Sequence, residues 1–136
     1  MSAKKYKVGI TFGAFSPLHF GHINLFINAK EMCDELIVCM SDDDYIKDKK
    51  GYSPNIPFID RFKHLCVISI IDKIDFQTIA FGKKEAVDRY NPDVIFVGSD
   101  WTPATYSGEG LGVPVEYLPH TDGISSTILR KIMSKK

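Results

Sequence analysis

Short, uniformly apolar segments alternate along this chain with segments of helical periodicity, and this alternation restricts the possible folds more than any other feature. The segments expected to form strands are 7–13, 35–41, 73–80, 93–101 and 113–119. The segments expected to form helices are 21–32, most of 56–70, 83–90 and 125–133. Apolar strands separated by helices are typical of a parallel sheet that is covered on both faces. We therefore expect the α/β fold class, as a Rossmann-like, doubly wound domain with a five-stranded parallel sheet.

Length and composition favour one domain that occupies residues 1–136. A chain of 136 residues can bury a sufficient core without disulfides or a structural metal. Its 17 Lys and Arg residues balance its 17 Asp and Glu residues, so it lacks the basic excess typical of nucleic-acid binders. No segment approaches the roughly 20 apolar residues that span a bilayer, and no signal-peptide core is present. We expect neither nucleic acid nor a membrane as a partner.

The three cysteines of the chain are isolated from one another: Cys33, Cys39 and Cys66. They form no C-x-x-C pair, their number is odd, and two of them lie within apolar runs. We therefore expect buried, reduced thiols rather than disulfides or metal ligands. This cysteine usage favours a reducing, cytoplasmic location.

Ligands of doubly wound sheets bind beyond the carboxyl ends of the strands. After the first expected strand, Gly13 permits a tight turn, and His19 and His22 lie three residues apart at the start of a helix. Two imidazoles beside the free N–H groups of a helix N-terminus suit a phosphate group. Each histidine could instead be a helix cap or a buried core residue. The pair could also be half of a metal site, although no third ligand follows at a suitable spacing.

The segment HTDGISSTILRK opens the last expected helix. Ser125, Ser126 and Thr127 place three hydroxyls and several backbone N–H groups at one helix start, directly after Gly123 and Ile124. A guanidinium suited to bidentate phosphate contact follows on the same helix. Simple capping by Ser125 is the alternative. Two anion-binding helix starts at one sheet edge favour a polyphosphate ligand between them.

A polar loop is expected at 42–55, after the second strand. It carries three lysines: Lys47, Lys49 and Lys50. Lysine runs are typical of solvated loops, but this loop lies at the ligand-binding edge of the sheet. Arg61 opens the next helix and could point the same way. Asp100 and Trp101, after the fourth strand, offer an acceptor and an aromatic surface for a nucleobase.

The HFGH and GISSTILR segments resemble the H-x-G-H and I-S-S/T-T motifs of the nucleotidyltransferase superfamily. The size of the chain and the order of its motifs are most similar to the glycerol-3-phosphate cytidylyltransferase family. The resemblance covers GAFSPLHFGH, SDDDY, the lysine loop with Tyr52, Arg61, GSDW and YLPHTDGISST. It implies that a polyol or sugar phosphate attacks the α-phosphorus of CTP in line, releasing pyrophosphate and a CDP-linked product. It also implies Mg²⁺ as a cofactor and a homodimer.

The resemblance further implies roles for individual residues. The catalytic residues expected from it are His19, His22, Lys47 and Arg130. The residues expected to bind the nucleotide are Gly13, Ala14, Phe15, Gly21, Lys49, Asp100, Trp101, His120, Thr121, Gly123, Ser125, Ser126 and Thr127. The residues expected to bind the acceptor are Lys47, Ser16 and Arg61. No side chain is assigned as a metal ligand.

Several positions depart from the pattern of this family. Ser16 stands where the family usually carries aspartate, Ala14 replaces a threonine, and His120 replaces an arginine. An acceptor-binding lysine near the position of Thr78 has no counterpart. We therefore expect an acceptor other than plain glycerol 3-phosphate, or one that is held differently. Two alternatives stay open: an adenylyltransferase of the same superfamily, of heptose 1-phosphate or pantetheine phosphate type, and a nucleotide-binding module without catalysis.

Overall fold

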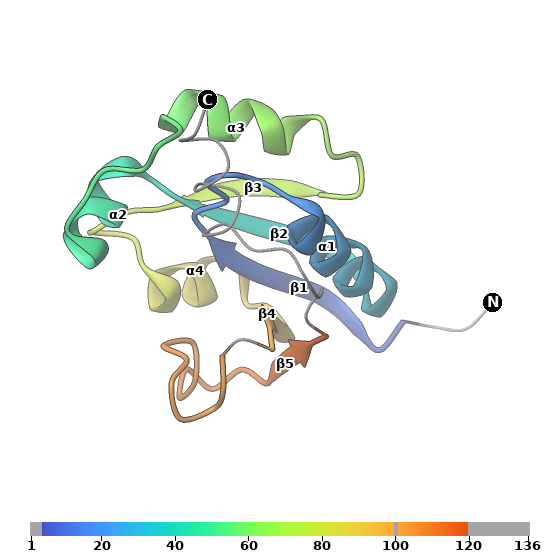
Figure 1. Ribbon diagram of the computed structural model, residues 1–136. Coiled ribbons are helices and arrows are strands. Elements are labelled where there is room, and N and C mark those ends of the chain that lie inside the picture. Colours follow the sequence, from blue (N-terminus) through green and yellow to red (C-terminus); the bar gives the residue numbers. More distant parts are fainter. Residues whose placement is uncertain (1–3, 100, 120–136) are drawn as a thin grey trace.

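A computed structural model of the chain describes residues 4–99 and 101–119 (Figure 1). Strands and helices alternate along most of it, as the apolar pattern predicts. In chain order the elements are β1 (Tyr6–Gly13), α1 (Phe20–Met32), β2 (Cys33–Ser41), α2 (Asp43–Lys50), α3 (Phe58–Cys66), β3 (Lys73–Gln77), α4 (Lys83–Tyr90), β4 (Val94–Gly98) and β5 (Val115–Leu118). The four helices and strands expected to begin before residue 60 are present, and α2 is an additional helix within the segment expected to be a loop.

The five strands form one parallel sheet in the order β3-β2-β1-β4-β5. The central strand β1 pairs with β2 on one side and with β4 on the other, so that Ile10 lies opposite both Ile37 and Ile95. The expected five-stranded, doubly wound sheet is therefore confirmed. Because every strand runs the same way, the loops after the strands meet at one edge of the sheet.

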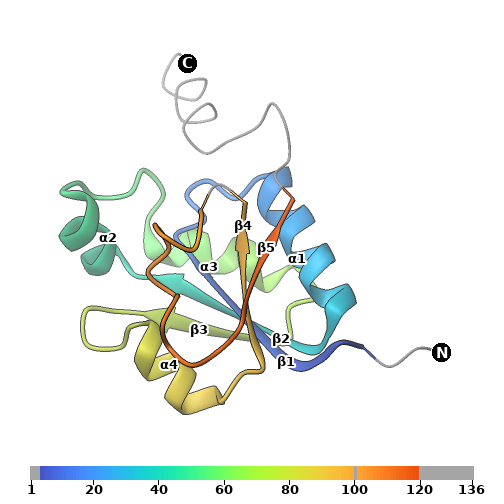
Figure 2. The ribbon, with the colours of Figure 1, turned by 90° about the horizontal axis from the view of Figure 1, so that it is seen from below.

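Helices cover both faces of the sheet. On one face, α1 and α3 pack through Phe26 and Leu65 against alternate residues of β2 such as Val38. On the other face, α4 packs through Ala86 against Cys39 and its neighbours on the adjacent strands. Figure 2 shows α4 and the loop between β4 and β5 on the side of the sheet that faces the viewer. The core is thus divided into two layers by the sheet.

The loop expected at 42–55 is wrong in its first half, because α2 occupies residues 43–50. Asp42 caps this helix by accepting the backbone N–H of Tyr45 at 2.8 Å. Gly51 ends it with a φ of 79°, which is the left-handed conformation that glycine adopts most easily. Only Ile46 of α2 is buried, so hydrophobic periodicity gives almost no signal for this polar helix.

Smaller differences concern the ends of elements and one cysteine. The third strand ends at Gln77 rather than at residue 80, because Thr78 and Phe81 bond to each other in a turn. Cys33 and Cys39 are buried as expected, but Cys66 is exposed at the end of α3 and corrects that expectation. Within residues 4–99 and 101–119, no helix combines the length and the apolar character that crossing a membrane requires.

Candidate active site at the carboxyl edge of the sheet

The two histidines lie together at the N-terminus of α1. His19 is the N-cap residue, and its Nδ1 accepts the backbone N–H of Gly21 at 2.9 Å. The backbone N–H of His19 in turn donates to Nδ1 of His22 at 3.2 Å, which completes a reciprocal capping box. The two rings stack with their centroids 3.9 Å apart and their planes inclined by 25°. The capping role that the sequence left as an alternative is therefore real, and it orients both rings.

These bonds determine which ring nitrogens can face a ligand. Because Nδ1 of each ring accepts a backbone N–H, a neutral imidazole at either position carries its proton on Nε2. Burial, together with the neighbouring His19, lowers the pKa of His22 to about 3. At neutral pH His22 is thus an uncharged hydrogen-bond donor through Nε2. Such a donor suits an anionic oxygen whose charge grows during a reaction.

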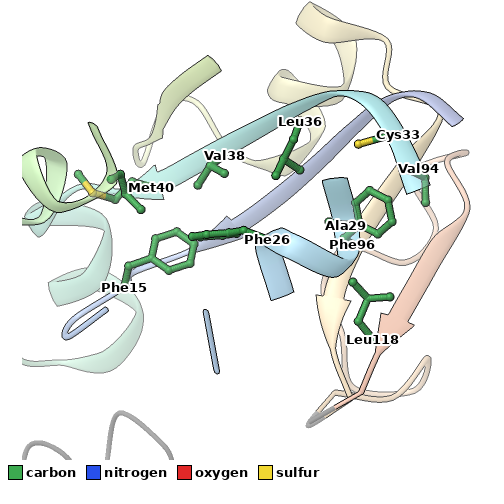
Figure 3. Packing of buried hydrophobic residues seen from close by; sticks show 11 residues of the cluster. Phe15, Phe26, Ala29, Cys33, Leu36, Val38, Met40, Val94, Phe96 and Leu118 are labelled. Atoms are coloured by element: carbon green, nitrogen blue, oxygen red, sulfur yellow. The ribbon is translucent and has the colours of Figure 1, made fainter. Parts of the chain in front are cut away.

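The loop after β1 packs against the ring of His22. Phe15 is buried with a φ of 54°, and its ring meets the His22 ring edge-on at 5.0 Å between centroids. The same ring packs against Phe26 of α1 at 5.4 Å, as Figure 3 shows. A side chain at Gly13 would place its Cβ only 2.8 Å from the Phe15 ring. The glycine expected to admit a ligand therefore admits the ring of Phe15.

A cavity of about 150 Å³, here called the histidine pocket, opens beside this loop. Three segments line it: Ala14, Phe15, Ser16 and His22 from the loop after β1 and α1, Ile46 and Lys50 from α2, and Tyr52, Pro54 and Asn55 from the loop after α2. The structure thus brings Ala14 and Phe15, expected to bind the nucleotide, together with His22 and with Ser16, which was expected to bind the acceptor. The pocket also contains Lys50 and Tyr52, for which the family resemblance implied no role.

A second cavity of about 320 Å³, here called the lysine pocket, lies at the same edge of the sheet. Its lining includes Lys49 of α2, Thr78 after β3, and Lys83 and Lys84 at the start of α4. Ser107 and Leu111 close it from the loop between β4 and β5. The carboxyl ends of β2, β3 and β4 therefore all contribute to this cavity.

Lys83 is the most unusual side chain of the lysine pocket. Its ammonium group lies over the ring of Phe12 at 5.2 Å and over that of Tyr106 at 5.7 Å. Burial, and then the positive charge of Lys49, lower its pKa. Within the described part of the chain no carboxylate forms an ion pair with it. A partly buried cation that has no counter-ion among the described residues, and that lies at the rim of a cavity, is suited to receive an anionic ligand.

Sequence reasoning missed the position of Lys83. The family carries an acceptor-binding lysine near the position of Thr78, and Lys83 is five positions later in this chain. The turn between Thr78 and Phe81 shortens that separation, with the two backbone bonds at 2.9 and 3.2 Å. Lys83 and Thr78 consequently line the same cavity. A turn signal at 78–82 is the clue that could have shown this.

Arg61 and Lys47, which were both expected to bind the acceptor, line neither cavity. Arg61 is fully buried and donates to oxygen atoms of this chain, so its guanidinium has no exposed surface with which to meet an acceptor. Lys47 is exposed on α2 and lines neither of the two cavities. The acceptor contact of Lys47 stays a prediction, whereas the complete burial of Arg61 is at odds with the acceptor contact expected for it.

The remaining predicted residues fall into two groups. Gly21 lies in the first turn of α1, and Trp101 is half-exposed beside Tyr106, at 5.9 Å between ring centroids. The predicted residues that lie outside the described part of the chain are Asp100, His120, Thr121, Gly123, Ser125, Ser126, Thr127 and Arg130. The predicted cap and helix at 125–133 lie outside it as well.

The described residues do not fit a resident metal ion. Residues 4–99 and 101–119 contain no group of three His, Cys, Asp or Glu side chains that could hold one. Ser16 offers only a hydroxyl where the family carries a carboxylate, which is the harder ligand for Mg²⁺.

Comparisons with known proteins show the family of this chain. The profile of a family described as cytidylyltransferase-like matches residues 10–132. The chain is similar to glycerol-3-phosphate cytidylyltransferase from Bacillus subtilis, with 34% identity over 124 residues that cover 90% of this chain and 93% of the relative. The matched region includes both histidines and residues 125–132 of the expected last helix.

Other similar proteins are longer or more distant. The bifunctional protein HldE from Campylobacter jejuni subsp. doylei is 31% identical over 140 residues, which cover the whole of this chain but 30% of the relative. The chain thus spans less than a third of that relative's length. A crystal structure of a lipopolysaccharide core biosynthesis protein from Thermoplasma volcanium shares the fold, with a TM-score of 0.67 at 22% identity over 85% of this chain and 97% of that one.

Proposed function

This chain belongs to the cytidylyltransferase-like family, and we propose that it transfers CMP from CTP to the phosphate of a small polyol or sugar. In this reaction an oxygen of the acceptor phosphate forms a bond to the α-phosphorus of CTP. The bond between the α-phosphorus and the bridging oxygen breaks, and pyrophosphate leaves with the electron pair. The products are a CDP-linked alcohol or sugar and pyrophosphate. The acceptor phosphate is already ionised, so the reaction needs no general base.

The arrangement of His19 and His22 is the observation that carries this proposal. In phosphoryl transfer, charge develops on the non-bridging and leaving oxygens, and catalysis consists mainly of positioning and charge stabilisation. The capping bonds of 2.9 and 3.2 Å make Nε2 the proton-bearing nitrogen of each neutral ring, and we assign the stabilisation of those oxygens to these donors. A module that only binds a nucleotide has no need of donors oriented for a transition state. These donors therefore favour an enzyme over a module that only binds a nucleotide.

The two cavities supply places for the two substrates. The histidine pocket contains the loop after β1 and Lys50, and we assign it to the phosphates of the nucleotide. The lysine pocket contains Lys83 and also Lys49, for which the resemblance implies a nucleotide contact, and we assign this pocket to the acceptor phosphate instead. Because Lys83 lies over two aromatic rings and forms no ion pair within the described residues, a dianionic phosphate gains a strong, partly desolvated partner there.

We propose that Mg²⁺ enters as the complex of the triphosphate, since magnesium is commonly held through substrate phosphates. It would supply charge neutralisation on the phosphate oxygens. The homodimer expected from the resemblance stays a prediction, which the sedimentation velocity of the purified chain would test.

Pyrophosphate release tests the proposal. The wild-type chain is incubated with Mg²⁺, each of the four common nucleoside triphosphates, and a panel of polyol and sugar phosphates that includes glycerol 3-phosphate. Release that requires CTP and one acceptor supports the proposal. A preference for ATP would instead favour the adenylyltransferase alternative. Tight nucleotide binding without release across the panel would favour the nucleotide-binding module.

A further inference from the structure

Arg61 has the largest side chain among those that are fully buried in the described part of the chain. It lies in α3, and its guanidinium donates to four oxygen atoms. Nε donates to the carbonyl of Ile56 at 3.0 Å, and Nη1 donates to the carbonyls of Ala14 at 2.9 Å and Ser41 at 2.6 Å. Nη2 donates to a carboxylate oxygen of Asp43. A planar fork of five donors is the group best suited to join several oxygens at fixed directions.

The partners of Arg61 correspond to the three segments that line the histidine pocket. Ala14 itself lines that pocket, in the loop after β1. Asp43 is the first residue of α2, which contributes Ile46 and Lys50 to the lining. Ile56 directly follows Asn55, the last lining residue of the loop after α2. One buried group is therefore bonded to one residue that lines the cavity, Ala14, and to residues in or next to the other two lining segments.

Asp43 is the part of this arrangement that holds the lysine-bearing helix. Its carboxylate pairs with Arg61 and also accepts the backbone N–H of Phe58, at the start of α3, at 3.3 Å. Its own side chain is 42% exposed, whereas that of Arg61 is completely enclosed. Removing the carboxylate charge would leave the buried guanidinium uncompensated, which strongly disfavours this docking of α2.

We propose that Arg61 is a positioning residue: through Asp43 and the carbonyls of Ala14 and Ile56, it holds the three walls of the histidine pocket at the separation that the nucleotide requires. This inference rests on the proposed function for the identity of the ligand, and on the bonds above for the role of Arg61. Arg61 meets neither substrate, in contrast to the acceptor contact predicted from the sequence. Substitution of Arg61 should therefore weaken nucleotide binding indirectly, by shifting the segments that line the histidine pocket.

Asp43→Asn is the sharpest test, because asparagine keeps the size and one acceptor oxygen but loses the charge. Asp44→Asn is the matched control, since Asp44 is the next residue of the same helix and is exposed. Arg61→Lys is the second variant, which keeps the positive charge but cannot reach all four oxygens. Hydrogen exchange of the α2 amides is measured without ligand, followed by the affinity for CTP and by kcat and KM for each substrate.

In Asp43→Asn we expect faster exchange across α2 and a kcat/KM for CTP that is lower by about tenfold to a hundredfold, as for a small misplacement of binding groups. Asp44→Asn should match the wild type in both measurements. The inference is overturned if Asp43→Asn and Arg61→Lys lose thermal stability but keep kcat and both KM values within about twofold. If the wild type turns over no nucleotide, the proposed function fails separately. CTP affinity, measured by calorimetry, then decides, and equal affinity in wild type and Asp43→Asn overturns the inference.

Discussion

The imidazole rings of His19 and His22 stack 3.9 Å apart at the start of α1, and Nδ1 of each ring is occupied by a backbone N–H. The same bonds that cap the helix therefore determine that Nε2 is the proton-bearing nitrogen of each neutral ring. Structural capping and transition-state donation are usually treated as competing explanations for such residues. Here one set of bonds serves both, because the cap fixes the direction of the donor.

Separating these two roles of His19 gives the first prediction. Serine is a strong N-cap but is too short to reach where Nε2 lies, so His19→Ser should keep the fold and lower kcat by about a hundredfold. His19→Ala should lower kcat similarly and also cost about 1 kcal/mol in the free energy of unfolding. His22→Ala should lower kcat by about a hundredfold as well. Steady-state pyrophosphate release and urea unfolding measure the two effects, and unchanged kcat in all three variants would contradict the catalytic assignment.

The burial of His22 predicts a pH dependence of stability. Its pKa is about 3 in the folded chain, below the ordinary value of 6.5, so the unfolded chain binds a proton first as the pH falls. The stabilisation is fully present above about pH 6.5 and is lost progressively towards pH 3. Between pH 7 and pH 5 the wild type should lose about 2 kcal/mol more than His22→Gln, which preserves the capping box. Urea unfolding at the two pH values measures this, and parallel losses in both proteins would refute it.

Lys83 should control affinity for the acceptor. Lys83→Met keeps the aliphatic contact with Phe12 and Tyr106 but removes the charge. We expect the KM of the acceptor to rise by about tenfold or more, while the KM of CTP changes by less than about twofold. Lys84→Met is the comparison, because Lys84 is exposed and already pairs with Asp88 at 3.2 Å. A larger effect at Lys84 than at Lys83 would contradict the assignment of the lysine pocket.

Two lysines of α2, Lys47 and Lys50, should act on different substrates. Lys47→Ala is predicted from the family pattern to raise the KM of the acceptor more than that of CTP. Lys50 lines the histidine pocket, so Lys50→Ala should raise the KM of CTP instead. Parallel initial-rate measurements with each substrate varied distinguish the variants. If Lys47→Ala raised the KM of CTP alone, the prediction from the family pattern would be wrong.

Gly13 should be required for the position of Phe15. In Gly13→Ala the new methyl group would lie 2.8 Å from the Phe15 ring, so the ring that supports His22 must move. We expect a loss of about 1–3 kcal/mol in the free energy of unfolding together with a lower kcat. Gly98→Ala is the control, because a Cβ at Gly98 meets no atom within 4 Å. Equal stability of both variants in urea unfolding would contradict this packing argument.

Much of this fold follows from local patterns. The helix predicted at 83–90 has the same bounds as α4, since Asn91 and Pro92 end it and its periodicity is clear. The parallel sheet follows from apolar strands that must be covered on both faces. By contrast, α2 is polar and depends on its caps at Asp42 and Gly51, so a pattern of buried residues does not reveal it.

The site was predictable where motif residues are neighbours in the chain, and not where folding brings them together. His19 and His22 are three residues apart, so helical geometry places them side by side. Lys83 lines the lysine pocket because of the turn between Thr78 and Phe81. Hydrophobic periodicity does not predict the path of such a turn. Arg61 donates a hydrogen bond to the carbonyl of Ala14, 47 positions away. Only the tertiary structure shows that this guanidinium bonds within the protein and does not face a ligand.

Phosphorus NMR of the complete reaction tests the central claim most directly. The wild-type chain is mixed with CTP, Mg²⁺ and the acceptor that supports pyrophosphate release. We predict the coupled resonances of a P–O–P linkage between CMP and the acceptor phosphate, formed in equal amount with pyrophosphate and about a hundredfold more slowly with His19→Ser. Consumption of CTP to free CMP or CDP without that linkage, or an equal rate of formation of the linked product with His19→Ser, would contradict the account.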